Sequence, residues 1–317
     1  MHPDALDADA DVMDRRLGIG AYSLPSLITI HPTDRCNHHC PWCWFERTSD
    51  QIDIGRLIDT LGSPAMTGVR EVIVSGGGEP LLHPEIGALF DYLRSWRPRD
   101  TRLYTHGGLL SRYAAAISDT FDYVRLSIDA GDAVTYQHLH GGRPGAFDKL
   151  FDDAAALIRE GTKVGVSMVV TQDNHTSVSL LIDRCAREGI SSILLKPVMA
   201  GMHREIISGP VADHWSAIGR EVDVVVRTEP TTPAVTSAAP PIAVATASVT
   251  VVPDGRVLPC CHLTEDQWTI ARVGREGDTD FARAHLRVAE QYSGTPHPCR
   301  IHDAWRRHQA ARSRFTK

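Results

Sequence analysis

Apolar and polar positions alternate in blocks along the middle of the chain. Six short runs rich in Val, Ile and Leu have the composition of β-strands and end near residues 30, 75, 106, 129, 170 and 197. Amphipathic helical patterns lie between them, roughly over 53–62, 84–96, 109–118, 146–160 and 177–188. This alternation predicts a parallel sheet with right-handed crossovers.

Six strand–helix units are two fewer than a closed eight-fold barrel contains. We therefore expect an α/β fold, a partial (βα)6 TIM-like barrel with a small α+β extension at its C-terminal end. Active sites of such folds lie where the strands end, so candidate chemistry is sought directly after each strand.

The pattern changes in the last third of the chain. A segment rich in Pro, Thr and Ala reads as a linker, and the next apolar runs read as a hairpin with Pro253-Asp254-Gly255 as its turn. Helical patterns follow at about 280–292 and 303–313. The predicted organisation is a tail over 1–26, a barrel over 27–226, a linker over 227–246 and a C-terminal module over 247–317.

Composition narrows the class of protein. The 317 residues carry 33 Lys and Arg against 39 Asp and Glu, a formal charge of −6, which argues against a general nucleic-acid binder. The acidic first residues lack the apolar run of a signal peptide, and the longest uncharged stretch is broken by prolines. We expect a cytoplasmic protein with no membrane partner. Its seven Cys favour metal or thiol chemistry over disulfides.

Three cysteines follow the first strand with the spacing C-x3-C-x2-C: Cys36, Cys40 and Cys43. Thiolates so close on one loop can converge on one metal centre. One interpretation is a structural zinc site with a fourth ligand from His38 or His39. The other is an iron–sulfur cubane held by three Cys, which leaves its fourth iron open.

A run of glycines, Gly76 to Gly78, follows the second strand and leads into Glu79 and Pro80. Consecutive glycines let the backbone approach a ligand closely, and their N–H groups can bind a carboxylate. Glu79 can accept a hydrogen bond from an ammonium group. The head group of an amino acid has both a carboxylate and an ammonium.

The cysteine spacing followed by Gly-Gly-Glu-Pro resembles the radical S-adenosylmethionine (SAM) superfamily over about residues 27–200. The resemblance implies a [4Fe-4S] cluster on Cys36, Cys40 and Cys43, with the amine and carboxylate of SAM on the open iron. It further implies reductive cleavage of SAM to methionine and a 5′-deoxyadenosyl radical, which abstracts a hydrogen atom from the substrate. A reducing partner such as flavodoxin or ferredoxin would supply the electron.

The same resemblance implies roles for residues near the other strand ends. Trp42 matches an aromatic residue that packs on adenine, and Tyr104–Gly107 and Leu126–Asp129 resemble the family's T-N-G and S-L-D segments. Thr105 and Ser127 are alternatively helix caps, and Lys196 is alternatively solvated. The predicted SAM contacts are Trp42, Gly77, Gly78, Glu79, Thr105, Ser127 and Lys196, and the predicted substrate contacts are Asp129 and Arg143. Cys185 is predicted to be a core residue on its helix.

Gly255-x4-Cys260 resembles the start of a SPASM or twitch extension, but the pattern is incomplete. Cys260, Cys299 and His302 are predicted ligands of a second iron–sulfur cluster, because His replaces Cys in some clusters. Alternatively, Cys260 or Cys261 is free and donates a hydrogen atom to a substrate radical. In a third interpretation the module has lost its metal and only covers the barrel.

Only about 26 residues precede the first strand, too few for the leader-peptide domain of many peptide-modifying relatives. This favours epimerisation, dehydrogenation or elimination on a small, polar, sugar-like natural-product intermediate. Maturation of a peptide is the alternative. A zinc-binding structural protein without turnover is the alternative from another class.

Overall fold

The computed structural model describes residues 25–43, 45, 47–141, 143–197, 209–228, 248–259, 266 and 269–274. The chain divides into two compact units, one built from residues 1–32, 51–73 and 233–317 and the other from residues 33–50 and 74–232. Within the described part of the chain, no helix is both long enough and apolar enough to cross a membrane.

The first unit contains the hairpin predicted from the Pro-Asp-Gly turn. Strand β8 (Ser248–Val251) pairs antiparallel with β9 (Arg256–Leu258), and Gly255 in the turn has a φ of +84°. Strand β10 (Ala271–Arg272) continues the antiparallel ladder beside β9.

The hairpin joins the sheet of the first predicted strand, because β8 lies parallel to β1 (Leu27–Ile30). Helix α2 (Ile54–Leu61), the 3-10 turn η1 (Pro64–Met66) and strand β2 (Glu71–Val74) follow in the segment over 51–73, except that Val74 of β2 belongs to the second unit. The predicted helices at 280–292 and 303–313 and nearly all of the predicted linker lie outside the described residues, so the predicted domain boundaries stay predictions.

The second unit has a sheet of five parallel strands in the order β3-β4-β5-β6-β7. Its strands are β3 (Asp100–Thr105), β4 (Tyr123–Ser127), β5 (Lys163–Val170), β6 (Ser192–Pro197) and β7 (Val225–Thr228). Its helices are α3 (Ile86–Trp96), α4 (Leu110–Thr120), α5 (Ala133–His140), α6 (Ala146–Arg159), α7 (Val178–Arg187) and α8 (Gly209–Glu221), with 3-10 turns η2 (Pro80–Leu82) and η3 (His175–Ser177).

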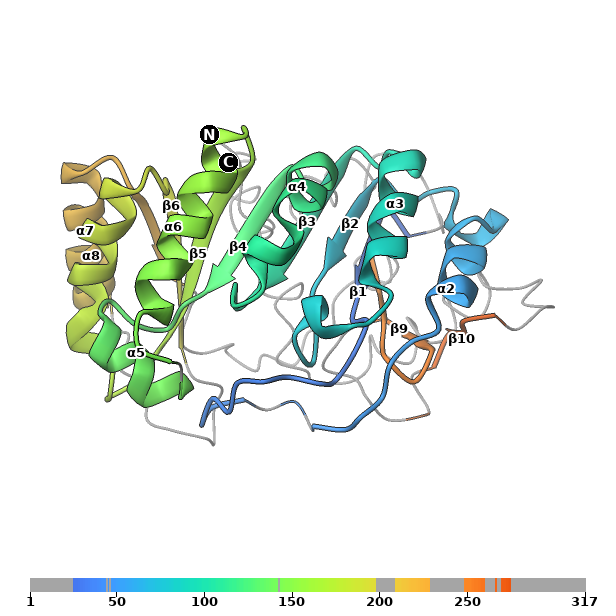
Figure 1. Ribbon diagram of the computed structural model, residues 1–317, viewed down its shortest axis with the longest axis horizontal. Coiled ribbons are helices and arrows are strands. Elements are labelled where there is room, and N and C mark those ends of the chain that lie inside the picture. Colours follow the sequence, from blue (N-terminus) through green and yellow to red (C-terminus); the bar gives the residue numbers. More distant parts are fainter. Residues whose placement is uncertain are drawn as a thin grey trace, which may run out of the picture. The chain divides into compact units, whose positions relative to one another are not determined.

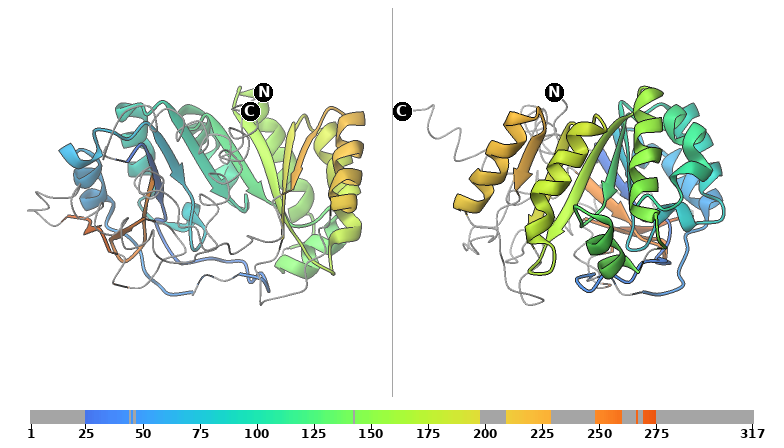
Figure 2. Two further views of the ribbon diagram at one scale, coloured as in Figure 1. Left: turned by 180° about the vertical axis from the view of Figure 1, so that it is seen from behind. Right: turned by 60° about the vertical axis from the view of Figure 1, so that its left-hand side comes forward.

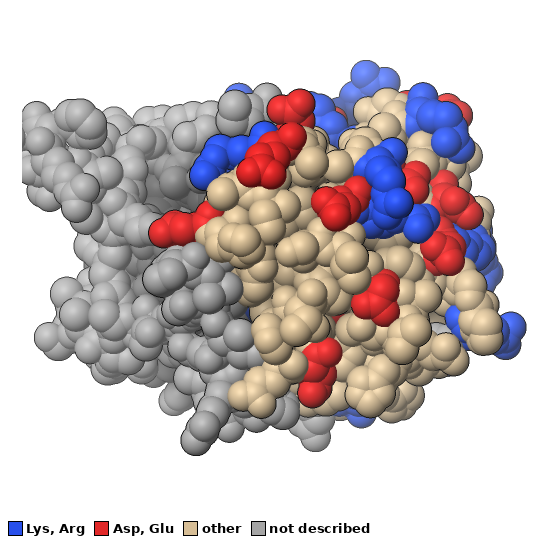
Figure 3. Space-filling view, turned by 90° about the vertical axis from the view of Figure 1, so that its left-hand side faces the viewer, with Lys and Arg blue, Asp and Glu red and all other residues tan. Residues whose placement is uncertain are grey.

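Helices cover one face of this sheet (Figures 1 and 2). Val124 and Leu126 of β4 are completely buried on that face. A Cβ at Gly107 would contact Leu126 of β4 together with Leu110 of α4 and Leu150 of α6, so these side chains pack together. Over α5, α7 and α8, charges of both signs are interspersed among uncharged residues on the surface (Figure 3).

The mostly parallel sheet with antiparallel C-terminal strands confirms the predicted fold class. The six predicted strands all form, and each ends within two residues of its predicted end. Cys185 is fully buried on α7, as predicted for a core residue. The short helix α5, with the sequence AVTYQHLH, was not predicted because it lacks an apolar stripe at helical spacing.

Candidate functional site

The cysteine loop leaves β1 and belongs to the second unit. Cys36, Cys40 and Cys43 are free and half-buried, and the Cys43 N–H donates to the Cys40 carbonyl at 3.1 Å. Burial raises the pKa of the Cys36 thiol, and burial with the nearby charges of Asp129, Cys36 and Cys43 raises the pKa of Cys40 to about 12. The metal-free Cys40 is therefore a thiol at neutral pH, and metal binding must release its proton.

The glycine-rich loop is bound directly to the cysteine loop. The Gly78 N–H donates to the Thr33 carbonyl at 3.0 Å, and the Glu79 N–H donates to the Arg35 carbonyl at 2.8 Å. A Cβ at Gly78 would lie 2.2 Å from the Arg35 carbonyl oxygen, and one at Gly77 would lie 2.5 Å from Asp34 Oδ1. Glycine is therefore needed here for the close approach of two backbones.

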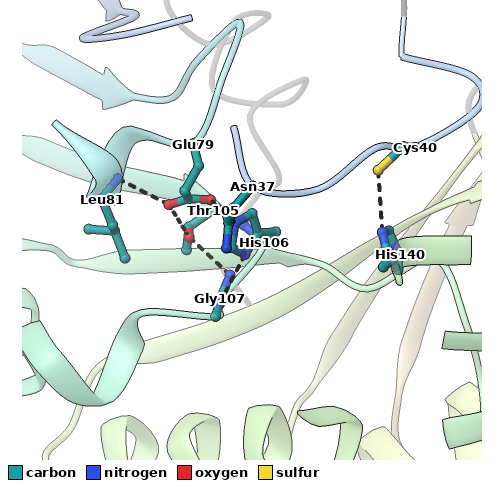
Figure 4. Close-up of polar contacts among 9 residues, drawn as sticks. Asn37, Cys40, Glu79, Leu81, Thr105, His106, Gly107 and His140 are labelled. Carbon is teal, nitrogen blue, oxygen red and sulfur yellow. Dashed lines mark hydrogen bonds and ion pairs between the residues drawn. The ribbon is translucent and has the colours of Figure 1, made fainter. Parts of the chain in front are cut away.

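Glu79 is only 2% exposed, and its carboxylate is held by three donors (Figure 4). Oε1 accepts from the Thr105 hydroxyl at 2.7 Å and from the Leu81 N–H at 3.0 Å, and Oε2 accepts from the His106 N–H at 2.9 Å. Burial raises its pKa to about 7 although these hydrogen bonds oppose the shift. Because a carboxylate has about four lone-pair sites, one remains for a further donor.

A neutral histidine lies beside this carboxylate. His106 Nδ1 accepts from the Gly108 N–H at 3.0 Å, so the proton of the neutral ring is on Nε2, which lies 2.7 Å from Asn37 Oδ1 and 3.4 Å from Glu79 Oε2. Burial and a nearby histidine lower the pKa of His106 to about 4. The ring of His38 stacks on His106 with centroids 3.9 Å apart.

A second histidine contacts the cysteine loop itself. His140 Nδ1 lies 3.3 Å from Cys40 Sγ (Figure 4). Its Nε2 lies 3.1 Å from the Ile128 carbonyl and 3.5 Å from Asp129 Oδ2. Burial and neighbouring histidines lower the pKa of His38 to about 3, and its Nδ1 is buried without a hydrogen-bond partner. The ligand atoms of His38, Cys40 and His140 lie within 4.8 Å of one another.

These donors are compatible with two kinds of metal centre. Three thiols on one short loop, with Cys36 and Cys43 near enough to raise the pKa of Cys40, suit a cubane that takes each thiolate on a different iron. The His38, Cys40 and His140 group offers the nitrogen and sulfur ligands that zinc prefers. Both centres would use Cys40, so the loop holds one or the other. The three cysteines thus fit the iron–sulfur cluster, and the zinc alternative has a defined ligand group.

Several predicted SAM contacts lie near this loop. Trp42 is buried against Leu139, and its ring meets that of His140 edge-on at 6.2 Å. Thr105 donates to Glu79 and accepts from the Gly107 N–H at 3.0 Å, so its hydroxyl already has partners. Ser127 is half-buried at the end of β4. The roles predicted for these residues stay predictions.

The remaining predicted contacts differ in burial. Asp129 is 2% exposed, has a φ of +52°, and accepts from the Val169 N–H at 2.6 Å. Lys196 is half-buried at the end of β6, and its charge acts to lower the pKa of Asp129. Arg143 is exposed in the loop between α5 and α6.

The C-terminal candidates Cys260, Cys261, Cys299 and His302 lie outside the described residues. Within the described part, Asn37 and His140 are site residues that the motifs did not identify. Asn37 sits inside the cysteine motif, where its contact with His106 depends on folding. His140 precedes Gly141 at the end of α5, and only the tertiary fold brings it to Cys40.

Comparisons with known proteins agree with this geometry. A family model described as "Radical SAM superfamily" matches residues 30–183, a segment that contains both loops. A probable GTP 3′,8-cyclase of Methanococcus maripaludis is 26% identical over 189 residues, which cover 55% of this chain and 62% of that protein. A pre-heme d1 synthase of Dinoroseobacter shibae is 30% identical over 190 residues, covering 57% and 46% of the two chains.

The chain thus spans less than two thirds of the length of these relatives. Among solved structures, Streptococcus suis SuiB bound to precursor peptide SuiA matches with a TM-score of 0.67 over 89% of this chain and 68% of SuiB, at 17% identity. That likeness concerns the fold. With the cysteine loop, the glycine-rich loop and the matched segment taken together, the chain belongs to the radical SAM superfamily, whose members use a [4Fe-4S] cluster and S-adenosylmethionine.

Proposed function

We propose that this protein cleaves SAM reductively and uses the resulting carbon radical to abstract a hydrogen atom from a substrate. The observation that supports this most strongly is the pair of hydrogen bonds from Gly78 and Glu79 to the cysteine loop. They hold three candidate cluster ligands beside Glu79, the candidate acceptor for the amino group of SAM.

Each part of the site has a task in this proposal. Cys36, Cys40 and Cys43 hold the cluster, which with SAM supplies electron transfer and the radical when both are bound. Glu79 accepts from the amino group of SAM at its remaining acceptor site. Thr105 acts indirectly in the described geometry, because its hydroxyl orients the Glu79 carboxylate.

The substrate we favour is a small, polar, sugar-like molecule that undergoes epimerisation, dehydrogenation or elimination. The sheet face opposite the helices supports this choice, since it carries Ser167, in register with the predicted SAM contact Ser127 on the adjacent strand. Hydroxyl groups of this kind can exchange hydrogen bonds with sugar hydroxyls. The relative named as a GTP cyclase also acts, by its name, on a small polar molecule.

Modification of a peptide is the second candidate. It is favoured by the fold shared with SuiB, whose solved complex contains the precursor peptide SuiA. Incubation with candidate sugars and with candidate peptides in deuterated buffer distinguishes the two, because the modified substrate changes in mass. Deuterium at carbon in the product would indicate a thiol donor, the role predicted for Cys260 or Cys261.

The proposed function is tested by anaerobic reconstitution, reduction, addition of SAM and chromatography for 5′-deoxyadenosine. We expect the wild type to form it and the Cys36→Ala, Cys40→Ala and Cys43→Ala variants to lose both iron and product. Cys185→Ala is the matched control, because Cys185 is also a free cysteine but is buried in the core. A colourless protein with stoichiometric zinc and no product would overturn the proposal in favour of the structural alternative.

The proposed auxiliary cluster needs a separate count. It would be supported if the wild type holds more iron and sulfide per chain than one cluster needs, and if the content falls to that of one cluster in Cys260→Ala or Cys299→Ala. Unchanged iron with a stalled product would instead support hydrogen donation by a cysteine, and an iron content of one cluster throughout would exclude the second site.

A further inference from the structure

A buried arginine on the sheet of the second unit has no anionic partner among the residues that the structure describes. Arg125 of β4 is 7% exposed, and within the described residues its side chain makes no hydrogen bond or ion pair. Its guanidinium carbon lies 3.5 Å from the ring centroid of Tyr104, the residue opposite it on β3. Because Val124 and Leu126 face the helices, Arg125 faces the other side of the sheet.

Two other arginines show how unusual this arrangement is. Arg102 on β3 is equally buried, but Asp100 binds its guanidinium in a bidentate manner at 2.9 and 2.7 Å. Arg112 also lies over a tyrosine ring, at 5.2 Å from that of Tyr113, but it is exposed to water. Arg125 is therefore nearly as buried as Arg102 but, within the described residues, makes no ion pair, as is also true of the exposed Arg112.

A guanidinium removed from water without an anion is strongly unfavourable, and a ring face offsets only part of this cost. Its planar donors match the oxygens of carboxylates and phosphates. The Tyr104 hydroxyl is a second polar group here: it is buried beside the Arg102 guanidinium, and among the described residues it has no partner within 3.5 Å. Because guanidinium groups only donate, the hydroxyl keeps its own proton for an acceptor. One oxyanion can reach both groups, because the hydroxyl belongs to the ring beneath the guanidinium.

The position of this pair relates it to the proposed active site. Ser127 follows Arg125 by two residues on the same face of β4, roughly 7 Å along the strand. The chemistry is proposed at the strand ends, where Glu79 and the cysteine loop lie. The arginine thus lies below the reacting end of the sheet and apart from the loops assigned to SAM.

We propose that Arg125 and the Tyr104 hydroxyl bind an oxyanion group of the substrate, a carboxylate or a phosphate. The inference rests on the proposed function in assigning the anion to the substrate. The anion site itself does not require SAM cleavage. It narrows the substrate class to small polar molecules that carry such a group.

Binding is measured on the full chain with inorganic phosphate and, separately, with acetate, at constant ionic strength set by chloride. Phosphate should raise the melting temperature of the wild type, and Arg125→Met should weaken phosphate binding by about tenfold or more, since the charge-assisted bidentate contact is lost. Arg112→Met, the exposed arginine above a tyrosine, should bind like the wild type. A stronger response to phosphate than to acetate identifies phosphate as the group.

Three results would overturn the proposal. They are an equal phosphate response in Arg125→Met, no response to either anion in the wild type, and loss of phosphate binding in saturating SAM, which would assign the site to the SAM carboxylate. If Arg125→Met does not fold, Arg125→Lys keeps the charge, loses the planar donors and should still bind phosphate more weakly than the wild type. Because no 5′-deoxyadenosine is measured, failure here and failure of the proposed function remain distinguishable.

Discussion

The two faces of the second unit's sheet differ in composition. The face beneath the helices is built from residues such as Leu103, Val124 and Leu126, which are completely buried and apolar. The opposite face carries Arg125 and Tyr104 on the same strands. Successive side chains of one strand thus alternate between apolar packing on the helix face and polar groups on the opposite face.

The comparison shows why the site can be polar without unfolding the protein. The apolar face supplies the burial that holds β3 to β7 in place. Polar groups at the other face and at the strand ends are then fixed by short contacts to one another, as Glu79 is by Thr105 and His106. Substitutions should accordingly affect stability on one face and ligand binding on the other.

The largest expected effect comes from backbone packing between the two loops. Gly78→Ala places a Cβ 2.2 Å from the Arg35 carbonyl oxygen, so the cysteine loop must move and most of the bound iron and sulfide should be lost. Gly87→Ala is the control, because nothing lies within 4 Å of its Cβ on α3, and it should stabilise the helix by about 0.5–1 kcal/mol. Iron analysis after anaerobic reconstitution measures the effect, and full iron content in Gly78→Ala would contradict it.

The second prediction separates the two faces of β4 directly. Leu126→Ala should lower the free energy of unfolding by about 3 kcal/mol, since it leaves a cavity beneath the helices. Ser127→Ala, its neighbour, should change that free energy by less than about 0.5 kcal/mol. Equilibrium urea unfolding measures both free energies. An equal decrease in the two variants would show that the two faces contribute equally to stability.

The third prediction concerns pH. The ionised Glu79 carboxylate is a stronger acceptor for the amino group of SAM than the neutral acid, and its pKa is raised to about 7. The dissociation constant for SAM should therefore increase about tenfold for each pH unit below 7 and level off above it. Glu79→Gln should bind weakly with no such slope, and a parallel slope in that variant would assign the effect to another group.

Stability should show the linked effect with the opposite sign. Folding raises the pKa of the Glu79 carboxyl from 4.5 to about 7, so the folded protein holds this proton more tightly than the unfolded chain. The free energy of unfolding should therefore fall as pH rises from 4.5 to 7. His38 and His106, with pKa values lowered to about 3 and 4, lose their stabilising contribution as pH falls below 6.5. The difference in unfolding free energy between wild type and Glu79→Gln isolates the carboxyl.

The smallest expected effect is a shift of that pH profile. The Thr105 hydroxyl lowers the pKa of Glu79, so Thr105→Val should move the midpoint of SAM binding to higher pH by less than about one unit. Thr101→Val is the control, because its hydroxyl bonds Thr120 and Asp122 near the start of β3. An unchanged midpoint in Thr105→Val would show that this hydrogen bond does not set the charge of Glu79.

Much of the fold was predictable because buried parallel strands are continuous apolar runs bounded by polar loops. The two motif loops were predictable for the same reason, since both follow such runs. Their mutual hydrogen bonds at Thr33 and Arg35 were not, because the glycines indicate a close approach but do not say which backbone or ligand approaches.

The remaining site residues depend on register. His140 reaches Cys40 only through the placement of α5. Arg125 faces away from the helices because it neighbours Leu126 on β4, and neighbouring side chains of a strand point to opposite faces. The SAM contact predicted for Thr105 stays a prediction, and the contacts of its hydroxyl with Glu79 and Gly107 could not be read from the sequence. A single sequence identifies the strand end but leaves open which partner a short side chain takes.

The most direct test of the central claim is electron paramagnetic resonance of the reduced, anaerobically reconstituted protein with and without SAM. We expect the signal of a reduced [4Fe-4S] cluster that changes when SAM is added, with the change weakened in Glu79→Gln and the signal absent in Cys40→Ala. A wild-type signal that ignores SAM, or a protein that binds zinc in place of iron, would contradict the assignment of this site to SAM cleavage.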